Sequence, residues 1–235
     1  MNRFYNILIF IVSFIAFPLT LSIGLNEDWT LFGLKIPGVE FEHKDLFFGI
    51  VSALVALLFV FKAKKKWTSL IIIKQKQRFD YHTGLSKARQ QRVMLYSIIE
   101  IVFILFIGYF FSNFNEVFIW LAPLYFIGAV EHVVHLIYGI SGKNYGIGIT
   151  NKALLSVDRE IYPVYFKGVK SISKQQNNLY FDYGKDLIIH FPLELIPTKE
   201  LPAFYNTLLD KIDVNKVFFQ GEELQKLVQE RLILN

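Results

Sequence analysis

The residues with the clearest chemical potential are ionisable side chains inside strongly apolar stretches of the sequence. Glu131, His132 and His135 interrupt one such stretch, and Glu100 interrupts the stretch before it. An ionisable group is costly to bury in a bilayer, and it often marks a proton pathway or a ligand site. Imidazole and carboxylate are also suitable ligands for Zn²⁺ and Fe²⁺. These four residues are therefore candidates for a proton relay or a divalent metal site.

The spacing of these residues favours a common site. In a helix, His135 lies about 40° and His132 about 100° around the axis from Glu131. The turn between the two apolar stretches is short, so they must pair antiparallel, with Glu100 within about one turn of Glu131. The order Glu-His-x-x-His matches neither the zincin motif nor its inverted form. A structural interpretation stays open, in which small residues let the helices approach and a Glu–His hydrogen bond holds them together.

A second candidate site is a set of basic residues next to an apolar stretch. The set comprises Lys64, Lys65, Lys66, Lys74, Lys76 and Arg78. Lys and Arg are retained on the cytoplasmic side of a membrane, so these residues can simply report topology. They can also attract anionic lipids, at about 1 kcal/mol for each basic residue near the surface. Because a position beside the membrane accounts for the charge, we do not expect nucleic acid as a partner.

The composition restricts the class of protein. The chain has 235 residues, of which 53% are hydrophobic and 19% charged, and its mean hydropathy is +0.38. Soluble domains carry about 25% charged residues, so the composition argues against an ordinary cytosolic enzyme. The chain has no cysteine, which excludes disulfides, thiolate metal sites and iron–sulfur clusters.

Four apolar stretches approach the length of about 20 helical residues that crosses a bilayer core. We expect transmembrane helices at about 5–25, 46–63, 93–111 and 117–140. The second stretch is short, so a buried or interfacial helix is the alternative there. The first stretch could instead be a cleaved signal peptide, since a basic residue precedes it and Ser22-Ile23-Gly24 forms a weak cleavage site.

The distribution of Lys and Arg predicts the orientation of these helices. Segment 62–92 carries ten basic residues, whereas segment 26–45 carries two. By the positive-inside rule, 62–92 is a cytoplasmic loop and 26–45 lies outside. Both termini then lie in the cytoplasm.

From residue 141 onward, short β-like runs alternate with turn residues. We expect strands at 146–150, 153–157, 161–165, 169–174, 179–183 and 187–191. A helix at 201–212 follows, with apolar residues spaced by three and four. The tail at 213–235 ends in a short amphipathic helix from Glu222. The predicted fold class is an α+β membrane protein, with four transmembrane helices before a small antiparallel β domain closed by a helix.

Two segments of the β region resemble a known family. The run 145–155, YGIGITNKALL, is similar to the opening of bacterial PH-like domains, where an aromatic residue, an apolar residue and Thr precede a strand. The run 166–172, FKGVKSI, resembles the segment before the mid-domain strand of that family, and the helix at 201–212 fits its closing helix. The resemblance implies a PH-like domain over about 144–212, in a protein of the bacterial inner membrane. It implies protein binding or assembly rather than a defined catalytic activity.

The first hairpin departs from the PH domains that bind phosphoinositides. Those domains place a tight basic cluster there, whereas this hairpin offers Lys152 and Arg159, with Asp158 and Glu160 beside them. Specific phosphoinositide binding is therefore not expected.

These observations predict a transmembrane domain at 1–140, a PH-like domain at 141–212 and a tail at 213–235. We expect an integral membrane protein that presents its cytoplasmic domain for protein interaction or assembly, without catalytic activity or a cofactor. Its partners would be the bilayer, with anionic lipids as an option, and a protein. The alternative is a small membrane enzyme, an ion or proton transporter, or a Zn- or Fe-binding protein that uses the Glu/His cluster.

Overall fold

The structure is a computed structural model of the chain. It describes residues 20–25, 28–31, 34–36, 42–114, 120–185, 187–213, 216–221 and 224–229. The chain divides into two compact units, of which unit 1 comprises 1–61 and 100–131 and unit 2 comprises 62–99 and 132–235. The expected helix at 5–25 lies outside the described residues apart from 20–25, which are helical. The tail helix is described at 224–229, also as helix.

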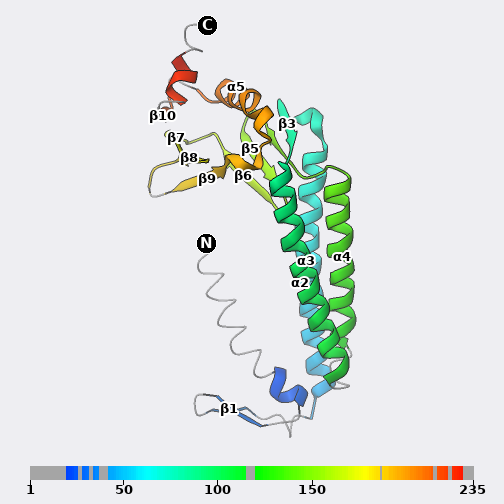
Figure 1. The fold of residues 1–235 in the computed structure, drawn as a ribbon. Helices are drawn as coiled ribbons and strands as arrows, with labels where there is room; N and C mark the ends of the chain where they lie inside the picture. The colour runs from blue at the N-terminus through cyan, green and yellow to red at the C-terminus, as the bar shows by residue number, and fades with distance from the viewer. Residues whose placement is uncertain are drawn as a thin grey trace. The chain divides into compact units, whose positions relative to one another are not determined.

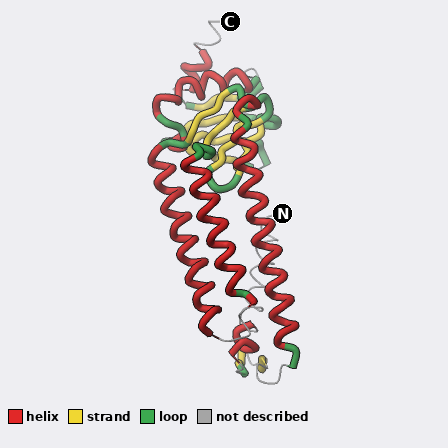
Figure 2. The backbone as a smooth tube through the Cα atoms, turned by 90° about the vertical axis from the view of Figure 1, so that its right-hand side faces the viewer, coloured by secondary structure: helices red, strands yellow, loops and turns green. Residues whose placement is uncertain are grey.

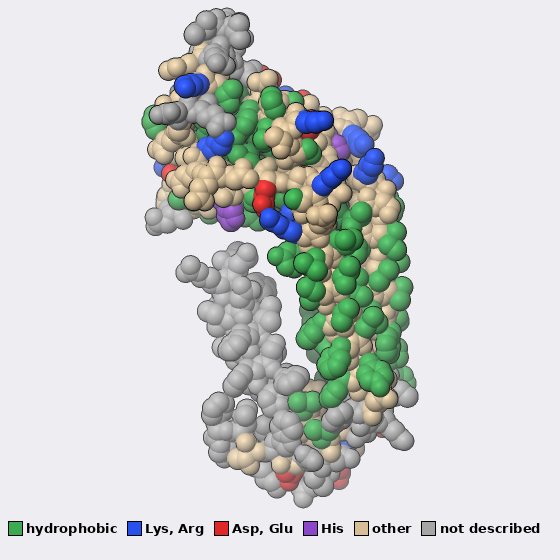
Figure 3. Space-filling model, in the orientation of Figure 1, with side chains coloured by type: hydrophobic (Ala, Val, Ile, Leu, Met, Phe, Trp, Pro, Cys, Tyr) green, Lys and Arg blue, Asp and Glu red, His purple; other side chains and the backbone are tan. Residues whose placement is uncertain are grey.

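Among the described residues, three helices are long and apolar enough to cross a membrane (Figures 1 and 2). They are α2 (Lys44–Lys74), α3 (Lys87–Phe114) and α4 (Ala122–Ser141). Most residues in their apolar windows are not buried by protein, and Figure 3 shows hydrophobic side chains along the helices. A large exposed apolar surface is typical of contact with lipid. Before α2, unit 1 also contains a short hairpin of β1 (Trp29–Leu31) and β2 (Leu34–Ile36).

Segment 62–92, which the sequence indicated as a loop, is largely regular structure. Helix α2 continues to Lys74 and α3 begins at Lys87, so both helices extend past the apolar stretches that predicted them. Lys and Arg are good helix formers, and a helix can therefore leave the bilayer without ending. Between the helices lie the 3₁₀ turn η1 (Lys76–Arg78) and the strand β3 (Tyr81–Gly84).

The β region of unit 2 contains the six strands expected from the sequence, with boundaries shifted by at most two residues. They are β4 (Gly146–Ile149), β5 (Ala153–Val157), β6 (Ile161–Tyr165), β7 (Ser171–Gln175), β8 (Asn178–Asp182) and β9 (Ile188–Pro192). After them come η3 (Leu193–Leu195), η4 (Thr198–Glu200), α5 (Leu201–Lys211) and β10 (Phe218–Gln220). The antiparallel meander is thus confirmed, and β10 is an addition to it.

The strands form two four-stranded sheets, in the orders β3-β4-β5-β6 and β10-β7-β8-β9. Every neighbouring pair is antiparallel except β10 and β7, which are parallel. Strand β3 was not predicted. It pairs with β4 in the register Tyr81 to Ile149 and Thr83 to Ile147. Helices α3 and α4 therefore form the connection between two adjacent strands of one sheet.

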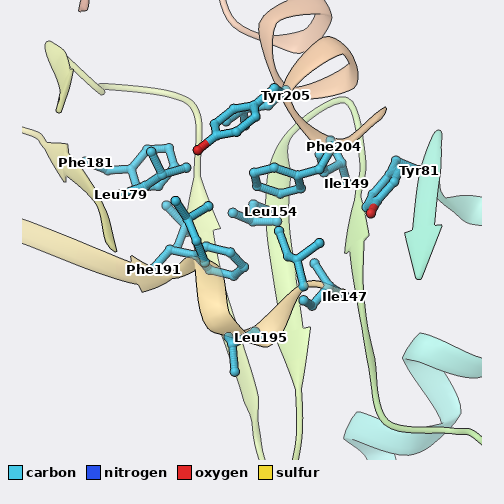
Figure 4. Packing of buried hydrophobic residues seen from close by; sticks show 14 of the residues in the cluster. Tyr81, Ile147, Ile149, Leu154, Leu179, Phe181, Phe191, Leu195, Phe204 and Tyr205 are labelled. Carbon is cyan, nitrogen blue, oxygen red and sulfur yellow. The ribbon is translucent and has the colours of Figure 1, made fainter. Parts of the chain in front are cut away.

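The core of unit 2 lies between the two sheets and under α5 (Figure 4). Phe191 of β9 stacks on Phe204 of α5, with ring centroids 5.8 Å apart and an interplanar angle of 11°. Tyr81 of β3 packs on the same Phe204 ring at 5.9 Å. Burying a large apolar side chain contributes about 1.5–3 kcal/mol. Strand β3 is thus a part of the core as well as an edge of the sheet.

The two glycines of β4 allow close approach by the segment that carries β3. A Cβ at Gly148 would meet the ring of Phe79, and a Cβ at Gly146 would meet the backbone oxygen of Thr83. Glycine is the residue that permits such approach of a backbone or ring to a strand. The Gly-Ile-Gly sequence is therefore explained by packing against the residues that precede α3.

Candidate functional site

The structure places the four ionisable candidates in different units. Glu100 and Glu131 are half-buried residues of unit 1. His132 and His135 are buried residues of unit 2, each with a relative exposure of 3%. Within unit 2, α4 presents both imidazoles from one face.

Lys66 of α2 contacts His132 in the interior of unit 2. Its Nζ lies 2.6 Å from His132 Nε2, and the lysine is 5% exposed. Lys66, one of the basic residues predicted for the membrane surface, is thus buried within unit 2. A lysine ammonium has donors and no acceptor, so neutral His132 accepts the hydrogen bond when Lys66 is protonated. Two cations at this distance would repel.

His135 lies in an aromatic layer beside this pair. Tyr145 Oη is 3.2 Å from His135 Nδ1, and both groups are buried. The Trp67 ring approaches His135 edge-on, with ring centroids 5.5 Å apart and an interplanar angle of 88°. Tyr145 directly precedes β4, and its ring fills the space that a Cβ at Gly139 would take. The glycine at 139 thus serves the packing of Tyr145 against α4.

One ring nitrogen of His132 is already in contact with a protein group. Its Nε2 already faces Lys66 Nζ, so a metal ion on that nitrogen would have to displace the lysine amine. Within the described ranges, no group of three or more His, Asp or Glu residues is arranged to hold a metal ion. A Zn²⁺ or Fe²⁺ site at Glu100, Glu131, His132 and His135 stays a prediction.

The other basic residues of the predicted set differ in their surroundings. Lys64 is exposed, and Lys65 Nζ is 2.5 Å from Glu160 Oε2 in an exposed ion pair. Lys74 donates to Tyr138 Oη at 3.0 Å. Lys74 lies ten residues beyond Lys64, or about 15 Å along the helix. Attraction of anionic lipids by these basic residues stays a prediction.

The turn between β5 and β6 is fixed against α2 and α3 within unit 2. Asp158 accepts from Arg89, with Oδ2 2.5 Å from Nη2 and 3.1 Å from Nε. Ser69 Oγ accepts from the backbone N–H of Ile161 at 3.0 Å. The Arg159 guanidinium lies over the Tyr96 ring, 5.6 Å from its centroid. The sequence did not indicate these contacts, because it carries no local signal for pairs so distant in the chain.

The segment around β3 is held by a second group of contacts. Ser86 donates from its backbone N–H to Leu195 O at 2.8 Å and from its Oγ to Glu194 O at 2.6 Å. Tyr81 Oη donates to Glu200 O at 3.3 Å. Burial, aided by the Glu200 charge, raises the pKa of Tyr81 to about 12. Burial and then the Lys76 charge lower the pKa of His82.

Three hollows on the described surface of unit 2 meet at His190 of β9. One of about 270 Å³ lies between His190 and Tyr162 of β6, beside Asp158 and Glu160. The other two, of about 440 and 480 Å³, lie on the outer face of the second sheet, where Tyr180 pairs with His190 across β8 and β9. Hydroxyl and amide side chains dominate these two hollows, so they offer hydrogen bonds rather than a reactive centre.

A comparison with known protein families, with curated proteins and with solved structures finds no match for this chain. The fold and the contacts define an α+β protein, in whose described residues three helices are long and apolar enough to cross a membrane.

Proposed function

We propose that the chain is an integral protein of a bacterial inner membrane that presents a PH-like domain to protein partners. In this proposal both termini lie in the cytoplasm, and the first apolar stretch supplies a fourth transmembrane helix. The domain acts in binding and assembly rather than in catalysis, and it needs no cofactor.

The pairing of β3 with β4 is the observation that carries this proposal. Because α3 and α4 connect these two strands, the sheet forms only when both ends of the helical hairpin meet. A domain that merely followed an anchor would need no such connection. The arrangement suits a module whose binding surface is fixed to the membrane helices, as expected for an assembly protein.

The two sheets and the helix support the PH-like interpretation of the domain. Four strands precede a second meander, and α5 then packs Phe204 and Leu208 into the core. The resemblance of the sequence predicts a bent antiparallel sheet closed by one helix. The parallel strand β10 lies outside that description.

A partner is best sought at exposed positions of the domain in intact membranes. A photo-crosslinking amino acid at Phe218 of β10 or Ala203 of α5, both exposed, should yield an adduct of discrete mass with one protein. The same group at Tyr109 of α3, which is 64% exposed on an apolar helix, is the matched control and should not yield that adduct. Absence of an adduct from both domain positions, at normal expression, would contradict the proposal.

The Lys66–His132 contact favours a second candidate function, in which the chain conducts or exchanges protons. Liposomes that hold the purified chain and a pH-sensitive dye would measure this directly. Lys66→Met and His132→Gln should abolish proton flux, while Lys64→Met, which removes an exposed neighbour, should keep it. Absence of flux with the unaltered chain would remove this candidate.

The metal-binding form of this alternative has its own test. Metal analysis of the purified chain should find stoichiometric Zn or Fe if the Glu/His cluster binds a metal. A variant with both His132→Ala and His135→Ala should then lose it. Metal that stays bound to the double variant would show that the metal-binding site lies elsewhere.

A further inference from the structure

The level of the bilayer surface can be located within unit 2 from α3 alone. After Arg92, the residues up to Ile99 carry no charge, and most of their side chains are exposed. Tyr96 stands one turn after Arg92, and tyrosine is enriched where a helix enters the headgroup region. The cation–π contact with Arg159 joins the β5–β6 turn to this tyrosine.

An exposed surface continues from this turn to β9. Tyr162 follows the turn on β6, is 49% exposed, and lines the same hollow as Asp158, Glu160 and His190. On β9, His190 shares the next hollow with Ile188, which is 59% exposed. We call Tyr162, Ile188 and His190 the lateral patch.

Three of the acidic groups around the lateral patch form ion pairs within unit 2, and a fourth, Asp182, accepts from the backbone N–H of Gly184 at 2.6 Å. Asp158 pairs with Arg89 and Glu160 pairs with Lys65. Glu194, at the edge of the neighbouring hollow, lies 2.6 Å from Arg92. Aliphatic, tyrosine and imidazole side chains framed by satisfied ion pairs suit the interface of a bilayer, where an apolar body and a polar tip are both accommodated.

We propose that the lateral patch rests on the headgroup region of the bilayer, so that the second sheet lies along the membrane surface beside α3. The occupant is lipid because the patch is continuous with the lipid-facing residues of α3 through Tyr96 and Arg159. The contact combines apolar side chains with the hydroxyl and amide groups of the adjacent hollow, so zwitterionic lipid is sufficient for it. This differs from attraction of anionic lipids by the basic residues of α2, and it does not depend on which protein the domain binds.

The absence of cysteine from the sequence permits a clean test by spin labelling. The full chain with Ile188→Cys is labelled with a nitroxide and placed in phosphatidylcholine nanodiscs. The matched control is Phe218→Cys on β10, where the native side chain is 61% exposed against 59% for Ile188. Collision with a water-soluble nickel complex should be several-fold lower at 188 than at 218, and collision with oxygen should be higher at 188.

Further outcomes decide the nature of the contact. Tyr162→Cys should behave as Ile188→Cys does, and added phosphatidylglycerol or salt should leave both unchanged. Equal nickel collision at 188 and 218 would overturn the proposal. Shielding of 188 from both oxygen and nickel would overturn it too, because a protein or a second copy would then cover the patch. A requirement for anionic lipid would overturn the contact with zwitterionic lipid. Circular dichroism spectra that match the unaltered chain confirm that each variant is folded.

Discussion

Tyr81 of β3 lies directly opposite Ile149 of β4, although helices α3 and α4 separate the two residues in the chain. The Tyr81 side chain is 8% exposed and packs on Phe204 of α5. One residue from between two apolar helices thus helps to close a core built mainly from the last third of the chain. The core of unit 2 therefore includes a residue that precedes α3 in the chain.

The first prediction concerns which fragment folds. A fragment of residues 141–235 lacks β3, leaves the edge of β4 unpaired and opens the core at Phe204, so it should show no cooperative unfolding. A second fragment that joins 76–86 to 144–235 through a short Gly/Ser linker should unfold cooperatively, because Gly84 pairs with Gly146. Thermal scans by circular dichroism compare the two. Cooperative unfolding of the shorter fragment would contradict this account.

The second prediction uses the raised pKa of Tyr81. Its ordinary value is 10.0 and its value in the fold is about 12, so the folded state favours the neutral phenol. The stability that the neutral phenol contributes is fully present below pH 10. About 2–3 kcal/mol of the free energy of unfolding is lost as the pH rises towards 12. Between these pH values the free energy of unfolding should fall more steeply for the unaltered chain than for Tyr81→Phe. Equal slopes in urea titrations would rule this out.

The third prediction compares two ion pairs of the β5–β6 turn. Arg89 and Asp158 have side-chain exposures of 26% and 23% and share two hydrogen bonds, whereas Lys65 and Glu160 are 60% and 50% exposed. Alanine double-mutant cycles should give a coupling of about 1.5–3 kcal/mol for the first pair. The second pair should give less than about 1 kcal/mol. A larger coupling for the exposed pair would count against the described docking of this turn.

The fourth prediction concerns two glycines. Gly148→Ala places a methyl group against the Phe79 ring and should lower stability by about 1–3 kcal/mol. Apart from the adjacent residues and the backbone of its own helix, no atom in the described part of the chain lies within 4 Å of a Cβ built at Gly49 of α2. Gly49→Ala should therefore raise helix stability by about 1 kcal/mol. Melting temperatures in detergent check both, and a destabilising Gly49→Ala with a neutral Gly148→Ala would contradict the packing described.

The strands from β4 to β9 could be predicted because their turn residues follow one another at short intervals. Strand β3 could not, since Tyr81 to Gly84 is too short to show an alternating pattern and its partner is remote. Of its two buried residues, Tyr81 and Thr83, the threonine is also common in turns. Local sequence contains no information on such a pairing.

The candidate site was predictable only in part. The sequence singled out His132 and His135 because imidazoles in an apolar helix are unusual, and both are buried. It placed Lys66 on the surface, because lysine is mostly exposed and the neighbouring lysines suggested a basic face. Which side of α2 faces α4 depends on packing that no local pattern encodes.

The central claim is that β3 and β4 are paired in the intact chain. A double variant with Thr83→Cys and Ile147→Cys places two thiols at directly opposite positions of these strands, in a chain with no other cysteine. Mild oxidation in native membranes should form an intrachain disulfide, seen as a mobility shift that a reductant reverses. A matched pair, Thr83→Cys with Phe218→Cys, should not form one. Failure of the first pair to oxidise, or equal oxidation of both pairs, would contradict the account.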